Sequence, residues 1–293
     1  MTVPPDYEAI FRFSQRPFSL TPDPRFYFRS RSHGRAFDTL STAIARRDCL
    51  MLVMGDLGVG KTTLCRTLIS APERQSRSAM VGNALLSPED LLRLMLQDLG
   101  AITKGDARQG TLGHATRAEL VQQFDQFLGE LHQANDGAVM IIDEAHSLPH
   151  ATMEQIIEIA GLDSNRHKVL QFLLAGQPAV GGAGTPPRLL DERFAVRARL
   201  LPLERDECER YVHHRLTIAG GAAVTFSAQA IDAIYSLSGG LPRLVNLLCE
   251  RGLQEAATAH ANCIEPAMID AAASALDLLR TRPRRFRWYA ARL

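Results

Sequence analysis

The chain has few of the features that mark disulfide-stabilised, metal-binding or membrane-spanning proteins. Its 293 residues include only five cysteines, with no C-x-x-C pair and no spacing typical of a metal site. We therefore expect the cysteines to be buried thiols in a reducing compartment. No apolar run approaches the roughly 20 residues that span a bilayer, and residues 1–6 do not resemble a signal peptide. These absences predict a cytoplasmic protein.

Aromatic residues are scarce, at 6% with a single Trp, but the hydrophobic content of 46% and charged content of 22% are ordinary for a globular protein. The formal net charge of +1 conceals an asymmetry. Residues 280–293 hold six arginines and no acid, which leaves 27 basic and 32 acidic residues in the rest of the chain, a net charge of −5. An acidic body argues against an extensive DNA-binding surface, whereas a basic tail indicates contact with an anionic partner.

The most informative stretch is a glycine-rich loop that follows the apolar residues 49–54. It reads Gly55-Asp56-Leu57-Gly58-Val59-Gly60-Lys61-Thr62 and matches G-x-x-x-x-G-K-[ST]. A helical pattern follows at residues 63–69. Strand, loop and helix in this order predict that backbone N–H groups surround a phosphate at the helix N-terminus. Lys61 would then reach the β- and γ-phosphates and Thr62 would hold Mg²⁺, so ATP and Mg²⁺ are the expected ligands.

A second apolar strand, at residues 138–142, ends in two carboxylates, Asp143 and Glu144. Carboxylates at the end of a buried strand are costly unless a cation or a water network compensates them. We expect Asp143 to bind the Mg²⁺ shell and Glu144 to polarise the attacking water. Gln177, which follows a strand predicted at residues 169–175, is placed to sense the γ-phosphate or to hold that water.

Alternating apolar strands and amphipathic helices predict an α/β domain, with a parallel sheet covered by helices on both faces and a last strand at residues 200–203. From residue 204 the strand signals stop, which indicates a small all-helical domain. Its predicted helices are residues 205–219, 227–238, 242–260 and 266–279. The expected domains are an N-terminal arm packed on the core (1–32), the nucleotide-binding α/β domain (33–203), the helical lid (204–279) and the basic tail (280–293).

Arg243 lies in the first turn of the third predicted lid helix. A cation there opposes the helix dipole, which favours a position facing an anion such as the γ-phosphate. The alternative is an arginine on the solvated surface.

Together these residues resemble the AAA+ ATPases, and more narrowly the ExeA-like group linked to bacterial type II secretion, pilus biogenesis and polysaccharide export. The resemblance covers about residues 7–276. Its marks, besides the loop at 55–62, are Pro17-Phe18-Ser19, Pro22-Asp23-Pro24, His33, Asp143-Glu144-Ala145-His146, Gly176-Gln177-Pro178, the Arg193-to-Leu203 segment and Gly240-Leu241-Pro242-Arg243.

The resemblance implies roles for individual residues. The implied catalytic residues are Glu144, Arg193, Arg243 and Gln177; the implied nucleotide-binding residues are Gly55, Asp56, Leu57, Gly58, Val59, Gly60, Lys61, Thr62 and Thr63; the implied metal ligands are Thr62 and Asp143. Arg243 corresponds to the sensor-2 arginine of the lid. Gln177 stands at the sensor-1 position, where asparagine is common. Arg193 corresponds to the arginine finger, with Arg197 as the alternative, and a finger acting on a neighbour's nucleotide implies a homo-oligomeric ring or filament.

The implied function is an ATP-hydrolysing switch or motor in bacterial envelope assembly, secretion or polysaccharide export, with the secretion or export machinery as partner. Secretion members of the group usually continue into a transmembrane segment and a periplasmic region, which we do not expect here. Related ATPases that regulate DNA transposition share the core, so a DNA-associated regulatory ATPase is the alternative. A non-hydrolysing scaffold is disfavoured because the catalytic residues are all present.

Two further patterns in the sequence have more than one interpretation. The tetrad that begins at Asp143 also matches the DEAH-box helicases, but the serine-alanine-threonine and paired-arginine motifs of those helicases do not follow it. The tail mixes its arginines with Trp288 and Tyr289. This composition suits peripheral contact with anionic lipid at the inner membrane, while nucleic acid and a solvated tail without a ligand remain alternatives.

Overall fold

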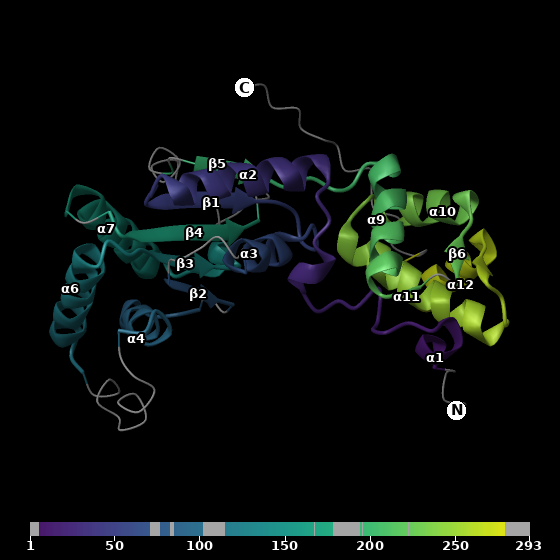
Figure 1. Ribbon diagram of the computed structural model, residues 1–293, viewed down its shortest axis with the longest axis horizontal. Coiled ribbons are helices and arrows are strands. Elements are labelled where there is room, and N and C mark those ends of the chain that lie inside the picture. The colour runs from purple at the N-terminus through teal and green to yellow at the C-terminus, as the bar shows by residue number, and fades with distance from the viewer. Residues whose placement is uncertain are drawn as a thin grey trace. The chain divides into compact units, whose positions relative to one another are not determined.

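The computed structural model describes residues 6–70, 77–82, 85–101, 115–166, 168–177, 194, 196–221 and 223–278. The chain divides into two units. The first is Pro22–Leu201, and the second combines Met1–Thr21 with Pro202–Leu293. Figure 1 labels most of the helices and strands of both units.

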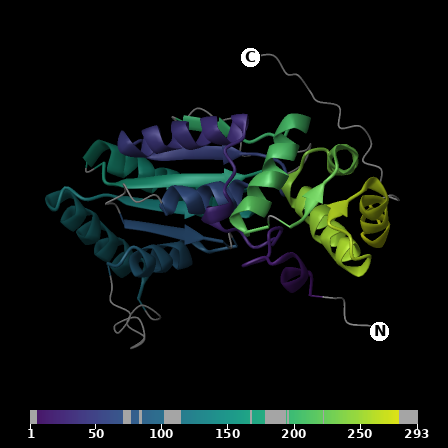
Figure 2. The same cartoon turned by 45° about the vertical axis from the view of Figure 1, so that its right-hand side comes forward.

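The first unit is built on a five-stranded parallel sheet in the order β2-β3-β4-β1-β5. The strands are β1 (Leu50–Met54), β2 (Arg77–Val81), β3 (Ala138–Ile142), β4 (Leu170–Gly176) and β5 (Val196–Arg199). They run side by side in one direction, as Figure 2 shows. Strands β1, β3 and β4 are almost entirely buried, as expected for a parallel sheet covered on both faces. This confirms the predicted α/β class.

Helices pack on both faces of this sheet (Figure 2). The helices of this unit are α2 (Arg31–Ala45), α3 (Lys61–Ile69), α4 (Pro88–Asp98), α6 (Arg117–Gln133) and α7 (His150–Arg166), with the short 3-10 helices η1 (Pro24–Phe26) and η2 (Ala145–Ser147). Two of these helices begin at side-chain caps. Ser87 caps α4, with its side chain accepting from the backbone N–H of Asp90, and Thr116 with Glu119 forms a capping box at α6.

The last strand lies four residues earlier than predicted. The sequence favoured the apolar residues 200–203, but β5 is Val196–Arg199 and pairs with β1 from Met51↔Val196 to Met54↔Arg199. Arg197 and Arg199 are exposed on this strand, whereas Ala198 is buried. The strand forms the edge of the sheet, so it needs fewer apolar residues than a central strand, and periodicity alone does not reveal it.

The second unit is mainly helical. Its helices are α1 (Tyr7–Phe11), α9 (Arg205–Ile218), α10 (Ala228–Ser238), α11 (Pro242–Thr258) and α12 (Pro266–Ala275). Two strands of two residues each, β6 (Thr225–Phe226) and β7 (Cys263–Ile264), form a parallel pair within it. The expectation of an all-helical domain is therefore corrected in this detail, because strands of two residues are too short to produce a period-2 pattern.

The N-terminal arm divides between the two units, contrary to the expectation that residues 1–32 pack on the α/β core. The Tyr7 hydroxyl donates to both carboxylate oxygens of Glu250 in α11, at 2.8 and 2.7 Å. The backbone N–H of Ser14 donates to the carbonyl of Ala219 at 2.9 Å. Within the arm, only the residues from Pro22 onward belong to the α/β unit, which is Pro22–Leu201. Aromatic and proline content predicts that the arm is buried but not which surface buries it.

The predicted basic tail, residues 280–293, lies outside the described residues. Within the described part of the chain, no helix combines the length and the apolar character needed to cross a membrane.

Candidate functional site

The glycine-rich loop joins β1 to α3 at the carboxyl end of the sheet. Its first residue, Gly55, continues the sheet pairing, because its N–H donates to the carbonyl of Gly176 at 3.2 Å. A Cβ atom on Gly55 would lie 2.7 Å from Val59 Cγ1 and 3.1 Å from the carbonyl oxygen of Leu200. Only glycine fits such a close approach. The loop geometry thus explains the sequence pattern locally.

Lys61 is the first residue of α3 and is only 4% exposed. Its Nζ donates to the carbonyl oxygens of Gly55 and Asp56, at 3.0 and 3.2 Å, so the ammonium group spans the loop. Burial lowers the pKa of Lys61, while the carboxylates of Glu144 and Asp143 act in the opposite direction. A buried cation beside a helix N-terminus favours an anionic ligand such as a phosphate.

Thr62 and Asp143 meet although they lie 81 positions apart in the sequence. The Thr62 hydroxyl donates to Asp143 Oδ2 at 2.5 Å, and Asp143 Oδ1 accepts from the backbone N–H of Glu144 at 3.0 Å. Asp143 is 4% exposed. A hydroxyl and a carboxylate in contact are the oxygen ligands that Mg²⁺ prefers. Among the described residues, no group of three or more His, Cys, Asp or Glu side chains is placed to hold a metal ion. The Thr62 hydroxyl and the Asp143 carboxylate fit a Mg²⁺ ion that also takes phosphate and water ligands.

Glu144 follows Asp143 in a left-handed conformation, with φ of 51°. Such a conformation is uncommon for a residue with a side chain and often occurs at functional sites. Gln177, at the end of the neighbouring strand β4, donates from Nε2 to Glu144 Oε2 at 3.4 Å. His146 Nδ1 lies 3.4 Å from the same oxygen. The structure therefore brings Glu144 and Gln177 together, and it adds His146, to which the sequence analysis gave no role.

The remaining predicted site residues lie on several different elements, and one of them is outside the described residues. Thr63 lies in the first turn of α3, and Leu57 is 62% exposed on the loop. Arg243 is exposed in the first turn of α11, within the helical unit. Arg197 lies on β5, and Arg193 is outside the described residues.

His33 is a second residue whose role the sequence analysis missed. It lies in the first turn of α2, is 5% exposed, and contacts the glycine-rich loop through Nε2, 2.9 Å from the carbonyl oxygen of Val59. The sequence contains no spacing that links residue 33 to residue 59, because only the packing of α2 beside the loop brings them together.

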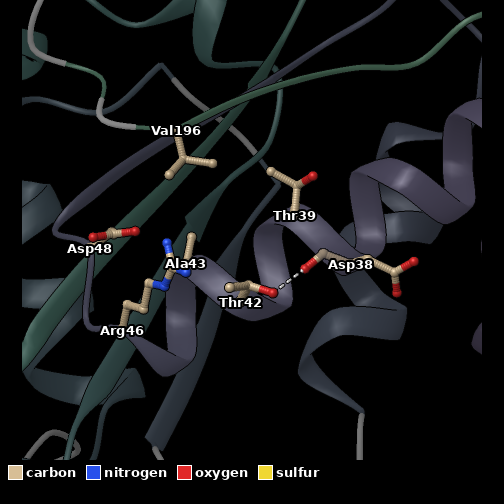
Figure 3. Close-up of a pocket in the computed structure, with 7 residues that line it drawn as sticks. All are labelled: Asp38, Thr39, Thr42, Ala43, Arg46, Asp48 and Val196. Atoms are coloured by element: carbon tan, nitrogen blue, oxygen red, sulfur yellow. Dashed lines mark hydrogen bonds between the residues drawn. The ribbon is translucent and has the colours of Figure 1, made fainter.

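A hollow of about 370 Å³ between α2 and β5 is distinct from this site (Figure 3). It is lined by Asp38, Thr39, Thr42, Ala43, Arg46, Asp48 and Val196. Val196 begins β5 and Asp48 lies two residues before β1, so the hollow is at the amino end of these strands. Ligands of parallel α/β sheets bind at the carboxyl ends, where the glycine-rich loop and Glu144 lie.

Comparison with known proteins gives consistent results. Residues 45–181 match the AAA domain family. The chain is 32% identical over 249 residues to general secretion pathway protein A of Aeromonas hydrophila, covering 84% of this chain and 44% of that protein. It is also 25% identical over 177 residues to the Holliday junction branch migration complex subunit RuvB of Desulfosudis oleivorans, covering 56% and 50%. The chain thus spans about half the length of the curated relatives it matches.

Solved structures show the same fold at lower identity. The Aeropyrum pernix ORC2 protein superposes with a TM-score of 0.67 at 15% identity, covering 90% of this chain and 72% of that one. The RuvB branch migration motor of Thermotoga maritima gives a TM-score of 0.54 at 19% identity, covering 89% and 72%. Together with the parallel sheet, the glycine-rich loop and the adjacent carboxylates, these similarities identify residues 45–181 as an AAA domain with the P-loop AAA+ fold, in a chain that is similar to general secretion pathway protein A.

Proposed function

We propose that this chain binds ATP with Mg²⁺ at residues 55–63 and hydrolyses it. The observation that carries the proposal is the contact between Thr62 and Asp143, with Glu144 directly beside it. Mg²⁺ bound by Thr62 and Asp143 would neutralise charge on the phosphates. Lys61 and the backbone of the loop hold the phosphate chain. Glu144 orients the attacking water and accepts its proton.

We propose different roles for Gln177 and Arg243. Gln177 contacts the Glu144 carboxylate at 3.4 Å, so it holds that carboxylate in position for the water. Arg243 belongs to the helical unit, and we propose that it reports the γ-phosphate to that unit. Arg193, with Arg197 as the alternative, would act on the nucleotide of a neighbouring subunit in a homo-oligomeric ring or filament.

Two substitutions test the hydrolysis itself. Lys61→Ala should abolish nucleotide binding, because it removes the buried cation from the loop. Glu144→Gln should bind ATP but lower kcat by at least about 100-fold, the usual contribution of a general base. Phosphate release and ATP titrations measure the two effects. Glu154→Gln, an exposed position on α7, is the matched control and should behave as wild type. Undiminished turnover by Glu144→Gln would remove Glu144 from the mechanism.

The cellular role we propose is that of a switch or motor in bacterial envelope assembly, secretion or polysaccharide export. The support is the 32% identity to general secretion pathway protein A, a protein named for secretion. Cytoplasmic location and peripheral contact of residues 280–293 with anionic lipid at the inner membrane remain predictions.

A DNA-associated regulatory ATPase is the second candidate. One structure with the same fold, at 14% identity and a TM-score of 0.68, is Drosophila ORC bound to DNA, but a likeness at this identity concerns the fold alone. The net charge of −5 outside residues 280–293 disfavours an extended phosphate-binding surface. Salt-dependent retention of DNA by the purified protein at physiological ionic strength would favour the second candidate over the first.

A further inference from the structure

His33 makes a specific contact with the backbone of the glycine-rich loop. Its Nε2 lies 2.9 Å from the carbonyl oxygen of Val59, and both residues are buried. A carbonyl oxygen only accepts hydrogen bonds, so Nε2 must carry a proton and donate it. The contact joins α2, which begins two residues earlier, to the loop that precedes α3.

The other ring nitrogen of His33 is held as well. Nδ1 lies 2.7 Å from Ser30 Oγ, the N-cap of α2, and Ser30 Oγ also accepts from the backbone N–H of His33 at 3.3 Å. Because the hydroxyl accepts from that N–H, its own proton is available to Nδ1, which leaves the proton of a neutral ring on Nε2. Tyr27 adds a hydrogen bond from its hydroxyl to the carbonyl oxygen of His33 at 2.8 Å. The ring is therefore fixed in position and tautomer.

Fixing the Val59 carbonyl also fixes the N–H of the next residue. A trans peptide unit is planar, with its C=O and N–H pointing in opposite directions. With the Val59 oxygen bonded to His33, the Gly60 N–H points away from the imidazole. Gly60 itself has a left-handed φ of 111°, and a Cβ atom there would lie 3.1 Å from His33 Nε2. The histidine and the glycine therefore fit each other closely.

We propose that His33 is a positioning residue for the phosphate chain of a nucleoside di- or triphosphate. It does not touch the nucleotide; it holds the Val59–Gly60 peptide so that the Gly60 N–H stays directed at the β-phosphate. The inference rests on the proposed function, since it concerns the same loop. It differs from a packing role, in which the imidazole would only fill space between α2 and the loop.

Two substitutions that introduce the same carboxamide group at different side-chain lengths distinguish the positioning role from the packing role. In His33→Gln the amide nitrogen can reach the position of Nε2 and donate to Val59. In His33→Asn the shorter amide can reach only the position of Nδ1, so the contact with Val59 is lost. We expect His33→Asn and His33→Ala to weaken ADP binding by about tenfold, as for the loss of one buried hydrogen bond, and His33→Gln to stay within about threefold of wild type.

The measurements are calorimetric titrations of the full chain with ADP, ATP and AMP, with thermal unfolding recorded for each variant. AMP lacks the β-phosphate, so its affinity should change little in any variant. For ATP turnover we expect KM to rise more than kcat falls. His150→Ala, an exposed histidine on α7, is the control and should match wild type.

The outcomes distinguish this inference from the proposed function. If ADP and AMP binding weaken equally, or if His33→Gln loses as much ADP affinity as His33→Asn, the imidazole is a packing residue and the inference fails while the proposed function stands. Wild-type ADP affinity in His33→Asn would overturn the inference in the same way. A wild-type protein that binds neither ADP nor ATP would refute the proposed function and this inference with it.

Discussion

At the scale of single residues, the site depends on the hydrogen bond between Thr62 and Asp143. Thr62 and Asp143 are in contact at 2.5 Å before any ligand is considered, and Asp143 is almost wholly buried. A buried carboxylate is stabilised by its hydrogen bonds, here from the Thr62 hydroxyl and the Glu144 N–H. The Thr62 hydroxyl and the Asp143 carboxylate both offer oxygen atoms, which are the ligands that Mg²⁺ prefers. Their contact therefore places two suitable ligands for a divalent cation side by side.

The first prediction at this scale concerns Mg²⁺. Thr62→Val keeps the branched shape of the side chain but removes the hydroxyl, so Mg²⁺ should no longer tighten nucleotide binding. We expect ATP affinity in Mg²⁺ to fall by about tenfold, roughly the loss of one charge-assisted contact, and ATP affinity in excess EDTA to stay unchanged. Titrations of wild type and variant with and without EDTA measure this.

Thr67→Val is the matched control for that experiment. Thr67 lies on the same helix, and its hydroxyl donates to the Thr63 carbonyl at 2.8 Å. It should bind Mg-ATP as wild type does. Equal loss of affinity in both threonine variants, or a loss in EDTA as large as in Mg²⁺, would show that Thr62 acts through the fold of α3 and not through the cation.

At the scale of elements, the arm that precedes Pro22 depends on a buried arginine. Arg215 of α9 is 6% exposed; its guanidinium donates to the carbonyl oxygens of Pro17 and Ser19, at 2.5 and 3.2 Å, and to the Tyr211 hydroxyl at 2.8 Å. Phe18, between the two carbonyls, is 1% exposed and packs edge-on against Phe226. The arm is therefore part of the core of the helical unit.

This arrangement predicts a stability effect. Arg215→Met keeps most of the side-chain volume but leaves the buried carbonyl of Pro17 and the partly buried carbonyl of Ser19 without this donor, so the helical unit should lose about 1–3 kcal/mol of unfolding free energy. Urea denaturation followed by circular dichroism measures the change. Arg210→Met, an exposed residue of α9 paired with Asp206, should cost less than about 1 kcal/mol. If the two variants are equally destabilised, the guanidinium does not anchor the arm.

At the scale of the whole molecule, the proposed oligomer makes a prediction that a monomeric enzyme does not. Arg193→Ala subunits would keep a complete site of their own but give their neighbour no arginine finger. Glu144→Gln subunits would have the opposite defect. Each variant alone should be nearly inactive, because a finger contributes about 10³–10⁵ in rate. In an equal mixture, about a quarter of randomly formed interfaces would pair the Glu144 of an Arg193→Ala subunit with the Arg193 of a Glu144→Gln neighbour. Those interfaces contain both catalytic groups, so ATP hydrolysis should reappear.

The mixing experiment has two informative failures. An Arg193→Ala protein that is active by itself would show that Arg193 is not the finger, and Arg197→Ala would then be mixed in its place. An inactive Arg193→Ala protein that mixing does not restore would place the arginine in its own subunit's site. Recovery of phosphate release on mixing is the result expected of a shared site.

The sequence by itself determined the parts of the site that are local in the chain. Residues 49–69 contain the strand, the loop and the start of the helix, so the backbone shape that surrounds a phosphate is specified by contiguous residues and their glycines. Likewise, Asp143 and Glu144 directly follow a strand whose apolar character marks it as buried. Parallel pairing then requires both segments to meet at one edge of the sheet.

Only the tertiary structure decided the contacts between residues that are distant in the chain. The edge strand β5, the pair β6–β7, the surface that buries the arm, and the positions of His33 and His146 all depend on which elements pack together. A local pattern records that a residue is apolar or polar, not which of several surfaces it meets. His33 shows this directly: its contact with Val59 spans 26 residues, and α2 has to pack beside the loop before the contact exists.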